Sequence, residues 1–165
     1  MSKTYSYLFS GTKGSITHDK SVIEKVSRGK LKAWAKDKMA SLTGKAKSSF
    51  NTACIVYDES TGKCYYGRNG GYKENGYTKN PLLFGDDTHD GILPKSPLNK
   101  FPVGNCAEVD AVNKALNAGA QLKNLHLTTI HVTKRAFGEY KASCENCKYT
   151  FKGRVKENYS GWVDN

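Results

Sequence analysis

Two short cysteine-containing segments hold the residues whose types and spacing could do chemistry. The first contains Cys106 and Glu108, and the second contains Cys144 and Cys147. Three thiolates suit a catalytic zinc ion, which takes three protein ligands and keeps a fourth position for water. A carboxylate beside that water can act as the general base. The sequence therefore predicts a zinc site at Cys106, Cys144 and Cys147, with Glu108 as the catalytic residue.

The first segment is predicted to open a helix over residues 109–118, where apolar side chains recur at helical spacing before Gly119. Residues two apart on a regular helix do not face the same way. Cys106 and Glu108 can therefore share a site only if Cys106 lies at the helix cap or in a distorted first turn.

The second segment is also predicted to open a helix, which reaches about Phe151. Cys144 and Cys147 are three residues apart, so they lie on the same side of a first turn, and Ser143 is a reasonable N-cap. The positive ends of both helices would then face the thiolates and lower their pKa values.

These pieces occur in an order that resembles the zinc deaminases: Cys-x-Glu at the start of one helix, then a helix and a strand, then Cys-x-x-Cys at the start of another helix. More narrowly, Gly-Asn-Cys-Ala-Glu at 104–108 resembles the deaminase domains of bacterial polymorphic toxins, in particular the YwqJ-type group. The resemblance covers about residues 51–153. It implies a three-layer α/β/α cytidine deaminase-like sandwich with a mixed central sheet. We expect one globular domain, in which a helical segment at 1–50 packs on a deaminase domain at 51–165.

The resemblance also implies a function, a zinc-dependent hydrolase that converts cytosine to uracil in nucleic acid, with single-stranded DNA favoured. The same site chemistry can attack adenine. The implied role is a toxin effector that acts in the cytoplasm of a target cell and is blocked by a cognate immunity protein. Because the first residues lack the apolar run of a signal peptide, delivery within a larger toxin is expected. We expect a monomer without a membrane segment.

Two departures from the wider deaminase pattern affect the site. Ser143 stands where a proline usually precedes the cysteine pair, and Cys106 stands where histidine is common. Three thiolates on a divalent zinc leave a net charge of minus one. A nearby cation should offset this charge, and Lys148 or Arg135 could supply it.

Simpler interpretations of the same residues remain open. The cysteines could form a structural zinc knuckle or be buried thiols, although no fourth ligand with a short spacing is obvious. His126 and His131 lie in a predicted strand, and Glu108 alone would be an ordinary first-turn acid. Two other functions also fit: a deaminase of free cytidine, or a zinc-stabilised nucleic-acid-binding module without catalysis.

The net charge of +11, from 26 basic and 15 acidic side chains, favours a polyanionic partner, nucleic acid before membrane. The alternative is that the net charge serves only to keep the protein soluble. The number of cysteines, five, is odd, and their spacing is not that of a disulfide framework. Both observations favour a reducing compartment.

The rest of the chain supplies the expected elements. Residues 1–20 are predicted to be irregular, and two helices separated by Gly29 follow them. Strands at 52–58 and 63–67 form a hairpin, a long loop covers 69–105, another strand covers 125–132, and the C-terminal residues finish the sheet.

The candidate substrate contacts come from loops near the predicted site. Asn69 follows the hairpin, at a place where the resembling family commonly binds the substrate sugar, although an Asn-Gly-Gly turn would favour asparagine anyway. Phe101 ends the long loop, which we expect to form a wall of the substrate channel and to offer aromatic side chains for base stacking. Arg135 and Phe137 lie in the loop before the second cysteine segment.

Overall fold

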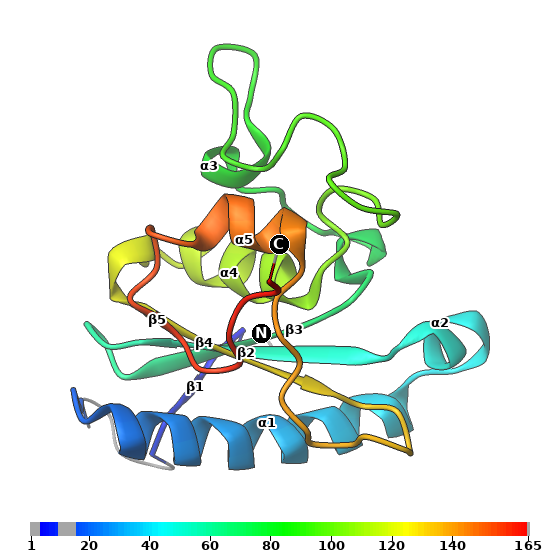
Figure 1. Ribbon diagram of the computed structural model, residues 1–165, viewed down its shortest axis with the longest axis vertical. Coiled ribbons are helices and arrows are strands. Elements are labelled where there is room, and N and C mark those ends of the chain that lie inside the picture. Colours follow the sequence, from blue (N-terminus) through cyan, green and yellow to red (C-terminus); the bar gives the residue numbers. More distant parts are fainter. Residues whose placement is uncertain (1–3, 10–15, 165) are drawn as a thin grey trace.

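The fold has three layers, with a five-stranded sheet between two layers of helices (Figure 1). The computed structural model describes residues 4–9 and 16–164. α1 (Lys20–Ser41) covers one face of the sheet, and α4 (Ala107–Asn117) and α5 (Glu145–Phe151) cover the other. This arrangement confirms the predicted α/β/α sandwich.

The sheet is mixed, as predicted. Its order is β1-β3-β2-β4-β5, with β1 at Ser6–Tyr7, β2 at Thr52–Asp58, β3 at Lys63–Arg68, β4 at Leu125–His131 and β5 at Glu157–Asn158. The central strand β2 runs antiparallel to both β3 and β4, whereas β5 runs parallel to β4. Because Thr52 pairs with His131, the start of β2 and the end of β4 lie side by side at one end of the sheet. The site described below lies at this end.

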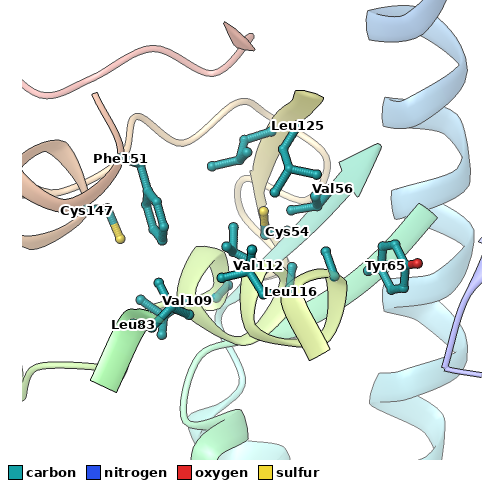
Figure 2. Packing of buried hydrophobic residues seen from close by; sticks show 14 residues of the cluster. Cys54, Val56, Tyr65, Leu83, Val109, Val112, Leu116, Leu125, Cys147 and Phe151 are labelled. Atoms are coloured by element: carbon teal, nitrogen blue, oxygen red, sulfur yellow. The ribbon is translucent and has the colours of Figure 1, made fainter. Parts of the chain in front are cut away.

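Alternating side chains along β2 build two cores. Cys54 and Val56 point to the side of α4 and α5, whereas Ala53, Ile55 and Tyr57 point to the side of α1. Figure 2 shows the first core gathered around α4, with Phe151 and Cys147 arriving from α5 and Leu83 from α3 (Pro81–Phe84). The helix α4, whose N-cap is Cys106, is thus fixed by packing on several sides.

α1 is one continuous helix, which corrects the predicted interruption at Gly29. Gly29 lies on the exposed face, so it costs helix propensity but removes no contact with the core. The buried stripe of Ile23, Ser27, Leu31 and Ala35 passes beneath it without a break. Tertiary packing of this stripe outweighs the local preference of one glycine.

Shorter elements were not all predicted. β1 extends the sheet where an irregular lead was expected, although residues 1–3 and 10–15 of that lead are outside the described part. The long loop contains α3 and a 3-10 turn at Gly71–Lys73. A second 3-10 turn lies at Leu122–Asn124, and a short helix, α2 (Gly44–Ser49), leads into β2. In the described residues, no helix has both the length and the apolarity needed to span a membrane.

Candidate active site

Each of the two cysteine segments begins a helix, as predicted. Cys106 is the N-cap of α4, so Glu108 in the first turn can face the same site. Cys144 is the N-cap of α5, one residue later than the expected Ser143 cap, and it makes no side-chain capping bond. The thiol of Cys144 is therefore free to face the other two cysteines.

The three cysteine sulfurs converge, although Cys106 lies far from the other two in the sequence. The Sγ atoms of Cys106, Cys144 and Cys147 all lie within 4.8 Å of one another, and those of Cys106 and Cys144 are 3.3 Å apart. A tetrahedral ion with Zn–S bonds of about 2.3 Å would hold its sulfurs about 3.8 Å apart. The cluster could therefore hold a metal ion, and among the described residues it is the one group of this kind.

The protonation of the sulfurs also suits a cation. Hydrogen bonds from Cys106 and Cys147 lower the pKa of Cys144 to about 2. The same contacts raise the pKa values of Cys106 and Cys147, to which burial also contributes. A cation bound by the three sulfurs would displace their protons, because cysteine ligates metals as the thiolate.

Glu108 is a buried carboxyl beside the sulfur cluster. Its side chain is 3% exposed, and its Oε2 accepts a hydrogen bond of 2.6 Å from Oγ of Ser143. Burial raises the pKa of Glu108 above its ordinary value, while the Ser143 hydroxyl and the charge of Lys141 oppose that shift. A raised pKa makes the carboxylate a stronger base, which suits a group that accepts a proton and later returns it.

The helix that carries Cys106 and Glu108 lies directly against β3. A Cβ atom on Gly67 would lie 2.3 Å from the backbone nitrogen of Ala111. Next to it on the helix, Oδ2 of the buried Asp110 accepts a hydrogen bond of 3.0 Å from the backbone nitrogen of Arg68. These two contacts fix the height and the rotation of α4 on the sheet, and hence the position of its first turn.

A pocket of about 110 Å³ opens onto the cluster and the carboxyl. Cys106, Cys144 and Glu108 all line it. Its other lining residues come from the start of β2, from the long loop, from the first turn of α4 and from the segment before α5: Asn51, Thr52, Asn69, Phe101, Asn105, Ala107, Lys141 and Ala142. A small molecule in this pocket would lie against both the cysteine cluster and the Glu108 carboxyl.

Two of the four predicted substrate contacts, Asn69 and Phe101, line this pocket. Phe101 is 45% exposed, so its ring is available to a ligand. The Asn69 amide instead holds the backbone, because its Oδ1 accepts from the nitrogens of Asn51 and Thr52 and its Nδ2 donates to the oxygen of Ser49. In the structure, Asn69 thus shapes the pocket through β2 and α2.

The other two predicted contacts, Arg135 and Phe137, are not among the pocket-lining residues. Phe137 packs against the core on the α1 side of the sheet, with Nζ of Lys36 5.8 Å from its ring centre. Arg135 is exposed in the same loop. A contact of either residue with substrate would require a ligand that extends beyond the pocket.

Sequence reasoning missed Lys141, which is the cation that lines the pocket. The sequence favoured Lys148 or Arg135 for this role, but Nζ of Lys148 donates to the backbone oxygen of Val163 at 3.0 Å, and neither residue lines the pocket. Lys141 lies three residues before Cys144, so its closeness in sequence to the second cysteine segment was the available signal.

Comparisons with models of protein families, with curated proteins and with solved structures found no match to this chain.

Proposed function

We propose that this protein is a zinc-dependent deaminase that converts cytosine to uracil in nucleic acid. The observation that carries the proposal is the convergence of Cys106, Cys144 and Cys147 beside the buried Glu108 in one pocket. The residues fit zinc, since thiolates favour soft or borderline metals and three ligands leave a coordination position for water. A purely structural site would normally be closed by a fourth protein ligand.

In the proposed reaction, Cys106, Cys144 and Cys147 would hold zinc, and Glu108 would transfer the protons. Bound zinc would supply a polarised water whose pKa is lowered to about 7, available to attack C4 of cytosine. Glu108 would accept a proton from that water and deliver it to the neighbouring ring nitrogen. Glu108 would then take the remaining proton from the hydroxyl added at C4 and pass it to the exocyclic amino group, so that the C4–N bond breaks, ammonia leaves and uracil is formed.

The charge of the chain supports a polymeric substrate over a free nucleoside. The net charge is +11, and Lys141 stands at the pocket itself. A nucleoside carries no phosphate and would gain little from this charge, whereas a polynucleotide backbone would. A base in a duplex must first leave the stack, which costs a few kcal/mol, so a single strand is favoured over a duplex, and we propose single-stranded DNA as the substrate.

The biological role that we propose rests on the resemblance of residues 104–108 to toxin deaminases. The protein would act as an effector in the cytoplasm of a target cell, delivered within a larger toxin. A cognate immunity protein would then block the pocket.

The first experiment offers the zinc-loaded protein single-stranded DNA, duplex DNA, RNA and free cytidine in parallel, and measures uracil and hypoxanthine by mass spectrometry. Uracil in a polynucleotide would support the proposal, and hypoxanthine would redirect it to adenine. Conversion of cytidine alone, with no salt dependence, would favour a nucleoside deaminase instead. If the zinc-loaded protein changed no base in any substrate, the deaminase proposal would fail.

A matched pair of variants separates an enzyme from a binding module. Glu108→Gln should keep zinc and oligonucleotide binding but lose turnover by about 100-fold or more, because general acid–base catalysis contributes on that scale. Glu145→Gln is the control, since Glu145 is also a first-turn acid, in α5, but does not line the pocket. A non-catalytic module would respond equally to both substitutions.

A further inference from the structure

Ser143 and Asn158 link the C-terminal part of the sheet to Glu108. Oγ of Ser143 lies 2.6 Å from Oε2 of Glu108, and Nδ2 of Asn158 lies 3.0 Å from the same Oγ. Ser143 is 1% exposed, and Asn158 lies in β5, which pairs with β4. Three separate segments of the chain therefore meet in one short series of hydrogen bonds.

The direction of each bond in this series follows from the groups around it. The backbone nitrogen of Ser160 can only donate, and it lies 3.1 Å from Oδ1 of Asn158, so that atom is the amide oxygen. Nδ2 of Asn158 must then face Ser143, to which it can only donate. The oxygen of Ser143 accepts this bond, and its one proton is left for Oε2 of Glu108.

Backbone hydrogen bonds also hold Ser143 in place. The nitrogen of Ser143 donates to the oxygen of Gly161 at 2.9 Å, and its oxygen accepts from the nitrogen of Val163 at 3.0 Å. Nδ2 of Asn158 also donates to the oxygen of Gly161 at 3.1 Å. The hydroxyl donor therefore has little freedom to turn away from the carboxylate.

We propose that Ser143 and Asn158 are positioning residues that fix the Glu108 carboxylate for proton transfer. Oε2 accepts the hydrogen bond from Ser143, which leaves Oε1 as the oxygen without this bond. Ser143 stands where a proline is usual in the resembling family. Proline has no hydroxyl and could not donate this hydrogen bond to Glu108. This inference rests on the proposed function for its kinetic consequence, but the geometry can be tested without it.

The kinetic test compares Ser143→Ala and Asn158→Ala with the wild-type zinc-loaded protein. We expect kcat to fall about 10-fold to 100-fold in Ser143→Ala, since small losses of alignment cost factors of this size. Asn158→Ala should show a smaller fall in the same direction. KM and zinc content should remain unchanged, and Ser143→Thr, which restores a hydroxyl, should recover part of kcat.

Ser160→Ala is the matched control. Oγ of Ser160 accepts a hydrogen bond of 2.6 Å from the backbone nitrogen of Thr129, so its loss should lower stability. Ser160→Ala keeps the backbone nitrogen that donates to Asn158, and the Ser160 hydroxyl makes no hydrogen bond to Ser143 or Glu108, so kcat should stay at the wild-type value. If kcat fell equally in Ser160→Ala, or stayed within about twofold of wild type in Ser143→Ala, the positioning role would be refuted.

Crystal structures of the zinc-loaded wild-type and Ser143→Ala proteins give a test that does not depend on turnover. The wild-type protein should keep Oε2 of Glu108 on the Ser143 hydroxyl, and Ser143→Ala should show a rotated carboxylate or more than one orientation. An unchanged single orientation in Ser143→Ala would overturn the inference even if the deaminase proposal held. A rotated carboxylate would support the inference even if no substrate were found.

Discussion

Nζ of Lys141 donates a 2.6 Å hydrogen bond to Oγ1 of Thr52, and both residues line the pocket. Three thiolates around a divalent zinc leave one negative charge, and the ionised Glu108 would add another. Lys141 is half-buried, so its charge is partly shielded from solvent. It is therefore well placed to offset the negative charge that zinc binding by the three cysteines would leave.

We expect Lys141→Gln to weaken zinc binding by about fivefold and to lower turnover, since an interaction of this kind is worth on the order of 1 kcal/mol. Competition with a chromogenic chelator measures the affinity. Lys148→Gln is the control, because the Lys148 side chain is bound to the backbone oxygen of Val163. Weaker zinc binding in Lys148→Gln with none in Lys141→Gln would contradict this assignment.

The cluster of three cysteines that could hold a metal ion was predictable from the sequence, because thiol chemistry and helix starts are local signals. The spacing of Cys144 and Cys147 and the apolar period after Glu108 were enough to predict a helix after each segment, although the N-cap of α5 is Cys144 and not Ser143. The direction of the Ser143 hydroxyl was not predictable, since it is set by Asn158 from a strand that the sequence barely marks. Lys141 was missed for the same reason: its neighbour Thr52 is 89 residues away along the chain.

A second buried network makes stability depend on pH. Nε2 of His126 lies 2.6 Å from Oε1 of Glu59, and Nδ1 of His126 lies 2.9 Å from the hydroxyl of Tyr159. Burial lowers the pKa of His126 below its ordinary 6.5, against the opposing effect of Glu59. Burial would raise the pKa of Glu59, but the hydrogen bond and charge of His126 and the charges of Lys156 and His18 outweigh it and lower that pKa below 4.5.

Both shifts predict loss of stability in acid. His126 takes up a proton more readily in the unfolded chain, so its contribution is complete above about pH 6.5 and declines as the pH falls below that value. Glu59 adds a further loss as the pH falls through its folded pKa, below 4.5. Urea denaturation from about pH 7.5 to about pH 4 should show this decline.

His126→Gln should flatten the upper part of that pH profile, because glutamine can still donate to Glu59 but does not titrate. His89→Gln is the control, since His89 is exposed in the loop that follows α3. A profile that stayed as steep in His126→Gln as in the wild type would assign the acid sensitivity to other groups.

Substitutions at Gly67 and Gly29 should have opposite effects on stability, because Gly67 lies against α4 whereas Gly29 has open space around it. Gly67→Ala would press a methyl group against the backbone of Ala111, so we expect a loss of about 1–3 kcal/mol in the free energy of unfolding and weaker zinc binding. Gly29→Ala meets nothing within 4 Å and should raise stability by about 0.5–1 kcal/mol without affecting zinc. Chemical denaturation measures the stability of both variants, and zinc titration measures their metal affinity. Unchanged zinc binding in a destabilised Gly67→Ala protein would contradict the expected effect of the α4 position on metal affinity.

The charge of α2 predicts where a polynucleotide would pass the pocket. Lys45 and Lys47 belong to α2, which ends beside the pocket because Asn69 donates to the backbone oxygen of Ser49. Phosphates on either side of a base held in the pocket would come near these lysines. We expect the double variant Lys45→Gln/Lys47→Gln to weaken binding of a single-stranded oligonucleotide and to reduce the salt slope by about 0.7 for each phosphate that is no longer neutralised.

Fluorescence anisotropy with Glu108→Gln protein measures this binding without turnover of the oligonucleotide. Lys123→Gln is the control, because Lys123 lies just before Leu125, at the end of the sheet opposite Thr52. Turnover of free cytidine, if it occurs, should be the same in the lysine variants and the wild type, since cytidine carries no phosphate. Equal weakening by Lys123→Gln would mean that the charge acts over the whole surface and that α2 provides no defined path.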